Sequence, residues 1–185
     1  MSTNAWFNEA YYLKNKLAQV RTTEPNDARW KQSDDLAIQS IVDAIHGIGI
    51  TIEQHFQQYG SAERTSPNPL FHANEYLVAK VNQLNETAED GRTNWTVQQV
   101  VDAIAKAGMT ILEHFQKHGW REGVNPSNKF DIDNYFADKL AQLQRDEPEK
   151  GWTLESVKQA FEDDLIDPIT HLELYGGEES LQSKE

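Results

Sequence analysis

The sequence contains no cysteine among its 185 residues. This absence excludes disulfide bonds, thiolate zinc sites and cysteine nucleophiles. The first twenty residues combine neither a basic leader with an apolar run nor a small-residue cleavage site, and no apolar stretch approaches the length of a membrane-spanning helix. We therefore expect no Sec-type signal peptide and no membrane insertion. The compartment stays open, because leaderless export and a cytoplasmic location both agree with these features.

Positive charge is also scarce, since 17 Lys and Arg face 30 Asp and Glu, for a formal net charge of −13. Affinity for nucleic acid depends mainly on basic side chains that neutralise phosphates, so we expect no nucleic-acid partner. Most of the acidic residues are scattered, which is typical of a solvated surface. Five Trp, seven Phe and six Tyr nevertheless supply large apolar side chains. A chain of this length and composition is expected to fold.

A repeated segment is the main feature that the chain does have. The segment Ile50–Gly60 returns as Met109–Gly119 and, in a more divergent form, as Ile166–Gly176. A fixed period identifies tandem repeats that fold as similar units. We predict three repeats of about 59 residues, covering residues 1–66, 67–124 and 125–177, followed by a polar tail at residues 178–185. Because one repeat is too small to bury its own apolar face, we expect a single cooperative structural domain.

Each repeat is predicted to begin with a helix that opens on a hydrophobic staple. A Phe just before the N-cap and a Tyr at the fourth helical position are placed to close over the first turn. Apolar residues then continue at helical spacing. The staple pairs are Phe7 with Tyr12, Phe71 with Tyr76 and Phe130 with Tyr135, and the predicted N-caps are Asn8, His72 and Asp131.

A second helix is predicted after a polar connection. Thr96 and Gln99 have the spacing of a capping box, and Trp95 precedes them in a staple position. The third repeat has the same arrangement at Trp152. In the first repeat Trp30 lies upstream, Leu36 takes the staple position, and Ser33, Asp34 or Asp35 is the predicted cap; Gly49 and Gly108 are predicted to end the second helix.

The third helix is predicted to be short. Thr51 and Thr110 are suited to cap it, and Asp167 before Pro168 does so in the third repeat. A His follows at the fourth position, where packing explains a half-buried ring with one satisfied nitrogen. A Gly with positive φ is predicted to end the helix. The histidines are His55, His114 and His171, and the glycines are Gly60, Gly119 and Gly176.

These patterns together predict an all-α protein of three tandem three-helix repeats packed into one compact array. No alternating apolar pattern long enough for a sheet appears in the sequence.

Metal ligation is the first chemistry to consider. His114 and His118 are spaced as i and i+4 on one helix face, which is the spacing of a two-histidine zinc pair. Glu113 precedes the first histidine and does not follow it, so the His-Glu-x-x-His protease pattern is not met. A metal-binding protein or metal-dependent enzyme that uses His114 and His118 is kept as an alternative.

Other carboxylate groups do not form a catalytic pattern. Asp131 and Asp133 resemble calcium ligands, but the positions that an EF-hand reserves for glycine and glutamate hold Phe136 and Gln142. A helix cap is the better interpretation of Asp131. The acidic run from Glu162 to Asp167 has no neighbour that would raise the pKa of one carboxyl over another. We therefore predict a non-enzymatic protein without a cofactor.

The strings described above also carry a resemblance. Phe-x4-Tyr, the Trp-Thr helix start and the segment His114–Pro126 resemble helical repeats of large secreted or surface-associated bacterial proteins, which include haemolysin-type calcium-repeat adhesins and surface-layer proteins. The resemblance extends over residues 7–176. It implies a non-enzymatic role in adhesion or surface attachment, with leaderless export to the cell surface. The calcium-binding nonapeptides of that family are absent, so no calcium ligand is implied.

The expected function is therefore a helical-repeat binding or structural module for a protein or glycan partner. Trp120 is the first candidate contact, because the other repeats place Ser61 and Gly177 there, and packing against the neighbouring repeat is the alternative interpretation of this residue. An acidic intracellular inhibitor of a basic partner remains a further alternative. The complete set of candidate binding residues is Trp120, Arg121, Trp30 and Arg64.

Overall fold

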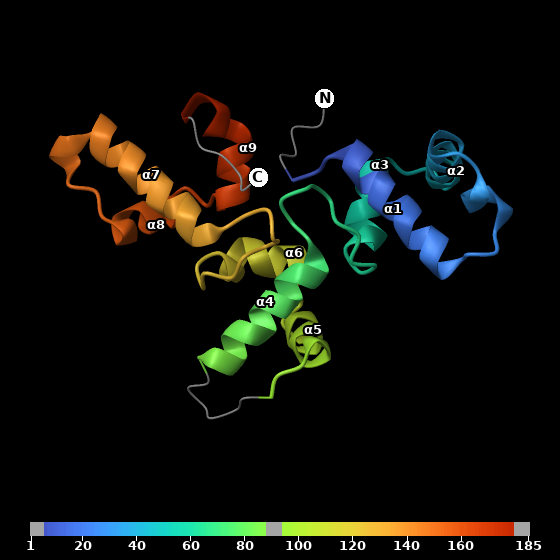
Figure 1. Cartoon of the computed structure of the whole chain (residues 1–185), viewed down its shortest axis with the longest axis horizontal. Helices are drawn as coiled ribbons and strands as arrows, with labels where there is room; N and C mark the ends of the chain where they lie inside the picture. The colour runs from blue at the N-terminus through green and yellow to red at the C-terminus, as the bar shows by residue number, and fades with distance from the viewer. Residues whose placement is uncertain (1–5, 88–93, 180–185) are drawn as a thin grey trace. The chain divides into compact units, whose positions relative to one another are not determined.

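A computed structural model describes residues 6–87 and 94–179 of the chain. Within these ranges the regular structure consists of α-helices with short 3₁₀ and π-helical segments, and no strand is formed (Figure 1). The predicted all-α class is therefore confirmed. The division into three repeats stays a prediction, and the terms first, second and third repeat refer below to residues 1–66, 67–124 and 125–177.

The chain forms two compact units, Met1–His72 and Ala73–Glu185. The smaller unit corresponds closely to the first repeat, and the larger unit contains most of the second and third. Cooperative unfolding of the whole chain stays a prediction.

The smaller unit is built from α1, α2 and a bent third helix, with α1 contacting α2 and α2 contacting α3. A 3₁₀ turn, η1, connects α1 to α2. The third helix begins as α3 and continues without a break as a π-helical turn, η2. The bounds are α1 Glu9–Thr23, η1 Ala28–Lys31, α2 Asp34–Gly47, α3 Ile52–His55 and η2 Phe56–Gly60.

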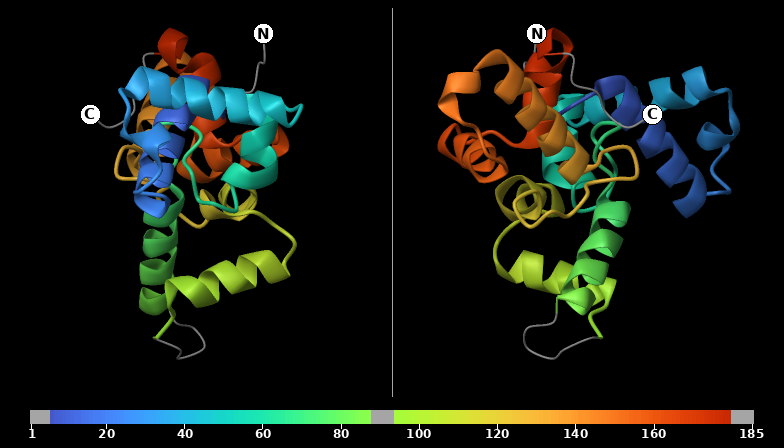
Figure 2. Two further views of the ribbon diagram at one scale, coloured as in Figure 1. Left: turned by 90° about the vertical axis from the view of Figure 1, so that its right-hand side faces the viewer. Right: turned by 60° about the vertical axis from the view of Figure 1, so that its left-hand side comes forward.

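Among its described residues the larger unit contains the helices α4 to α9, with the π-helical turn η3 after α6 and the 3₁₀ turn η4 between α7 and α8. In the left-hand view of Figure 2, α5 begins near the C-terminal end of α4 and runs away from it at a wide angle. The helix α6 contacts both α4 and α5, while α7 contacts α8 and α9. The bounds are α4 Ala73–Glu86, α5 Val97–Lys106, α6 Ile111–His114, η3 Phe115–Gly119, α7 Ile132–Asp146, η4 Pro148–Lys150, α8 Leu154–Asp163 and α9 Pro168–Glu179.

The predicted starts of the first helix are confirmed in two repeats. The Asn8 side chain accepts a hydrogen bond from the Tyr11 amide, and Asp131 caps α7 in the same manner. Phe7 packs against Tyr12 with ring centroids 5.5 Å apart, as the staple prediction requires. The prediction fails for His72, whose buried Nδ1 has no hydrogen-bond partner and so caps nothing.

Capping boxes open the second helix in the second and third repeats. Thr96 and Gln99 form the predicted box, and Thr153 forms one with Ser156. The first repeat differs, because Ser33 stands at the N-cap without a side-chain bond. Leu36 is 57% exposed, so its predicted staple role is wrong. The apolar face of α2 that packs inward is made by Ala37, Ile41 and Ile45.

The glycines after the repeated histidines do not act as predicted. Thr51 and Thr110 form the expected capping boxes. Gly60 and Gly119, however, are not among the residues with positive φ, and each closes a π-helical turn. Gly176 lies inside α9 and does not end it. The residues with left-handed backbone are Gly49, Gly108, Gly123 and Gly151, together with Arg64 and Leu165.

Close packing is the physical reason for glycine at two of these positions. A Cβ atom added to Gly60 would lie 2.6 Å from the Tyr12 hydroxyl, and one added to Gly119 would lie 2.8 Å from Cε2 of Tyr76. Any larger side chain would therefore collide with a tyrosine ring that is itself fully buried. Glycine is required here because a ring lies against the backbone.

Candidate functional site

A tyrosine–histidine hydrogen bond recurs at three places in the chain. The distance between the tyrosine hydroxyl and Nδ1 of the histidine is 2.8 Å for Tyr12 and His55, 2.6 Å for Tyr76 and His114, and 2.7 Å for Tyr135 and His171. Each bond joins the first helix of a repeat to the third. The sequence predicted a half-buried histidine with one satisfied nitrogen, and it placed the tyrosine in a staple, but it did not pair the two.

A lysine one helical turn after each tyrosine adds a charged group. Lys16 forms an ion pair of 2.6 Å with Glu63, and Lys80 forms one of 2.7 Å with Glu122. Lys80 also donates to the Gln83 side chain, and Lys139 donates to Gln142 in the equivalent place. Lys80 and Lys139 are both buried. Tyrosine, histidine, lysine and glutamate thus form a shared polar cluster in the first two repeats.

The protonation states follow from burial and from these charges. Burial, with a smaller effect of Glu63, raises the pKa of the Tyr12 hydroxyl, and burial with Glu122 raises the pKa of Tyr76. Burial is also the main cause that lowers the pKa of His55 and His114, and the neighbouring lysines lower it further. At neutral pH the Tyr12–His55 and Tyr76–His114 pairs therefore each consist of a neutral phenol and a neutral imidazole.

Tyrosine, histidine and lysine side chains also occur in acid–base sites. Here the position of each tyrosine–histidine pair, between two helices, favours a structural role. In each pair the tyrosine hydroxyl engages Nδ1 of the histidine, so this nitrogen is not the one that could take a proton from a substrate. The same bond occurs at equivalent positions along the chain, where it connects two helices. A hydrogen-bonded buried pair of this kind stabilises the packing of those helices, because either group alone would be left unsatisfied.

The predicted metal candidates lie side by side on one helix face. The rings of His114 and His118 have centroids 5.4 Å apart. His118 is exposed, whereas the Nδ1 atom of His114 is engaged by Tyr76. Over residues 6–87 and 94–179, no group of three or more His, Asp or Glu side chains is arranged to hold a metal ion. The calcium-like residue Asp131 caps α7, as expected.

Trp120 does not lie at the surface. Its side chain is 1% exposed, and its ring packs near Phe136 and Phe161 with centroids 5.8 and 6.3 Å away. Its indole N–H donates to the Gln116 carbonyl. The prediction that Trp120 contacts a partner is therefore wrong for this structure. The residue fills the space between the second and third repeats within the larger unit.

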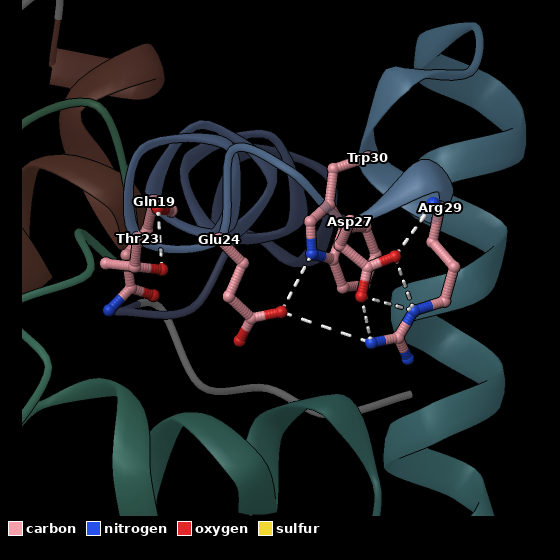
Figure 3. Close-up of polar contacts among 6 residues, drawn as sticks. All are labelled: Gln19, Thr23, Glu24, Asp27, Arg29 and Trp30. Atoms are coloured by element: carbon pink, nitrogen blue, oxygen red, sulfur yellow. Dashed lines mark hydrogen bonds and ion pairs between the residues drawn. The ribbon is translucent and has the colours of Figure 1, made fainter.

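Trp30 is also buried, with an exposed fraction of 6%. Figure 3 shows its indole N–H donating to Glu24, at 3.0 Å, while the neighbouring Arg29 forms an ion pair with Asp27. Trp152 donates to Glu147 in the same way in the third repeat. The predicted binding role of Trp30 is wrong because its ring is buried. The residue lies in η1, the connection between α1 and α2.

The two arginines remain at least partly accessible. Arg121 is exposed, stacks over the Trp120 ring and forms an ion pair of 2.8 Å with Glu162. Arg64 is half-buried and has a left-handed backbone with φ of 58°. The second repeat has Gly123 at the equivalent position. The binding role of Arg121 and Arg64 stays a prediction.

A shallow groove in the larger unit is a feature that the sequence analysis missed. It has a volume of about 520 Å³ and runs along α4 beside the loop at residues 125–128. The loop is held to the helix by the Asn128 amide, which donates to Glu75 at 2.7 Å. The asparagines Asn74, Asn82 and Asn128, which the other repeats lack, were the available signal. The lining residues are Asn74, Glu75, Val78, Ala79, Asn82, Asn125, Ser127 and Asn128.

The fold and these sites define an all-α protein with helices joined by tyrosine–histidine pairs. Comparisons with protein-family models, with curated proteins and with solved structures found no match. In the described ranges no single helix has the length and hydrophobicity to cross a membrane, although α2 and the segment Ile52–Gly60, bent by 82°, pass that test as a pair.

Proposed function

We propose that this chain is a non-enzymatic helical scaffold that binds a protein or glycan partner at a bacterial cell surface. The observation that carries the proposal is the use of the tyrosine–histidine pairs. Side chains that could act as acids or bases, such as Tyr76 and His114, hydrogen-bond to one another and so join two helices. What remains available to a partner is the outer surface of the helices and loops. The resemblance of the repeats to surface-associated bacterial proteins supports the location.

The test separates binding from folding. The purified chain is incubated with envelope and cytosol fractions of the source cell, and the bound fraction is measured against protein concentration. We expect saturable binding to envelope material and none to cytosol. The Tyr76→Phe variant, assayed well below its melting temperature, should bind as the wild type does, because the pair is internal.

Two outcomes would contradict the proposal. The first is a lack of saturable binding to either fraction. The second is stoichiometric zinc or iron that survives dialysis of the purified protein, since this would favour the metal-dependent alternative at His114 and His118. A His118→Ala variant distinguishes a genuine site from a contaminant, because only a genuine site would lose its metal.

A further inference from the structure

We propose that the groove along α4 is a binding site for a neutral saccharide. This inference rests on the proposed binding function and specifies the ligand and the surface. The site lies wholly within the larger unit, and its parts are held by the hydrogen bond between Asn128 and Glu75. Ligand sites combine an apolar surface with a few placed polar groups, and this groove has both.

Three asparagine side chains supply the polar groups. Asn74 and Asn82 project from α4, and Asn128 projects from the facing loop. All three are exposed, and their carboxamides form no hydrogen bond within the described residues. Asn125 differs, because its Oδ1 accepts from the Ile132 amide. A carboxamide both donates and accepts, so it can bind two adjacent hydroxyl groups of a sugar ring.

The apolar part of the groove lies between these amides. Val78 is 51% exposed and Ala79 is half-buried beside it. An aliphatic surface of this kind suits the C–H face of a sugar ring, because burial of both apolar surfaces is favourable. The carboxamides suit the hydroxyl groups of a ligand, and the aliphatic surface of Val78 and Ala79 suits its apolar face.

The charges that line the groove favour a neutral ligand over an anion or a metal cation. The groove contains one carboxylate, Glu75, and no basic side chain. An anionic ligand would meet this carboxylate and a strongly acidic chain, whereas a metal cation would require several carboxylates. One oxygen of Glu75 already accepts from the Asn128 amide. A neutral ligand rich in hydroxyl groups therefore fits better than either kind of ion.

The asparagines are not required by the repeated fold. At the position of Asn74 the other repeats have Ala10 and Asp133. The position of Asn82 holds Ala18 in the first repeat and Ala141 in the third. The position of Asn128 holds Pro69 in the first repeat. All three side chains are exposed, so the packing of the helices does not require an amide at these positions.

The experiment titrates the purified full chain with maltotetraose, cellotetraose and N-acetylchitotetraose, and follows the side-chain amide signals of asparagine by NMR. We expect one of these sugars to shift the signals of Asn74, Asn82 and Asn128 in a saturable manner. The double variant Asn74→Ala, Asn82→Ala should bind that sugar at least tenfold more weakly, a change of about 1.4 kcal/mol. Its melting temperature should stay unchanged, because both side chains are exposed.

Asn134→Ala is the matched control, since Asn134 is an exposed residue in the first turn of α7 outside the groove. It should bind as the wild type does. The inference is overturned if none of the three sugars shifts the groove amides, or if the double variant and Asn134→Ala bind equally well.

The envelope assay keeps this failure separate from failure of the proposed function. If the wild type binds envelope material but the double variant binds equally, the scaffold role survives and the groove is wrong. Loss of binding after protease treatment of the envelope would point to a peptide partner, and it would also overturn the saccharide assignment.

Discussion

The two junctions between successive repeats differ in one large side chain. After η3, Trp120 is buried against Phe136 and Phe161 of the third repeat. After η2, the equivalent residue is Ser61, which is only half-buried. The chain divides into compact units near the junction that has serine and stays undivided at the junction that has tryptophan. Trp120 thus joins the second and third repeats inside the larger unit.

A second, smaller difference concerns the hydrogen bonding of one polar side chain after each π-helical turn. Asn125 accepts a hydrogen bond from the Ile132 amide. The equivalent Ser66 is buried, and its hydroxyl has no hydrogen-bond partner. A buried hydroxyl without a partner lowers stability by about 1–3 kcal/mol. Asn125 therefore satisfies a backbone amide inside the larger unit, whereas the Ser66 hydroxyl lowers the stability of the smaller unit.

Removal of Trp120 should have the largest effect. We expect Trp120→Ala to lower the free energy of unfolding of the larger unit by about 3–5 kcal/mol, because it leaves a cavity beside Phe136 and Phe161. Urea denaturation measures the loss. The control is Leu174→Ala, a truncation of an exposed side chain in the same unit, which should change it by less than about 0.5 kcal/mol. An unchanged midpoint for Trp120→Ala would show that this ring does not join the repeats.

The glycines that face a tyrosine ring test packing that both units share. Gly60→Ala and Gly119→Ala should each destabilise their unit by about 1–3 kcal/mol, because the added Cβ collides with a buried ring. Gly47 is a helical glycine with no atom within 4 Å of an added Cβ. Gly47→Ala should therefore stabilise the smaller unit by about 0.5–1 kcal/mol. Equal effects at the three positions would contradict the proposed close approach.

The tyrosine–histidine bond can be removed with little change in shape. Tyr12→Phe and Tyr76→Phe should each lower the unfolding free energy by about 1–2 kcal/mol, because a histidine nitrogen loses its partner. Hydrogen exchange of the backbone amides assigns each loss to its own unit. Tyr11→Phe is the control, since the Tyr11 hydroxyl has no partner within the described residues. A loss as large in the control would mean that the bond itself contributes nothing.

Acidification should destabilise both units. The pKa of His114 and of His55 is lowered in the folded chain, mainly by burial, so below about pH 6.5 the unfolded chain binds more protons. Their contribution is present above that pH and is lost as the pH falls. Lys80 and His118 both lower the pKa of His114, opposed by Glu122, whereas Lys16 alone lowers that of His55, opposed by Glu63.

His118→Tyr gives the larger unit the residue that the smaller one has at Tyr59. It should reduce the loss of stability between about pH 7.5 and 5.5, a range that avoids most carboxylate titration. Chemical denaturation at several pH values, with hydrogen exchange to separate the units, measures the change. A pH dependence that is identical in wild type and variant would contradict the contribution of His118.

The sequence predicted the local features of the fold well. Helix starts depend on neighbouring residues, and the capping boxes at Thr51, Thr96 and Thr110 were found from spacing alone. The all-α class followed from the same local patterns. These predictions succeed because the partners in a cap lie within one helical turn.

Contacts between distant residues were not predicted. Tyr12 and His55 are separated by 43 residues, and a pattern read along one helix cannot pair them. The burial of Trp120 depends on Phe136 and Phe161 in other helices, so the sequence alone leaves both a surface contact and packing open for its ring. The groove depends on a loop that folds back onto α4. Each of these features is set by tertiary packing, which spacing along the chain does not report.

The smallest predicted effect concerns the end of the second helix. Gly49 and Gly108 have positive φ there, whereas the third repeat places Leu165 in the same conformation with φ of 54°. A left-handed backbone strains any residue with a Cβ atom by about 1 kcal/mol. Leu165 is 89% exposed, so its side chain adds little packing. Leu165→Gly should therefore raise the unfolding free energy of the larger unit by about 0.5–1 kcal/mol, and Gly108→Ala should lower it by a similar amount. If thermal and urea denaturation show that both substitutions destabilise, the conformational argument at Leu165 is wrong, because the leucine must then contribute contacts that outweigh its strain.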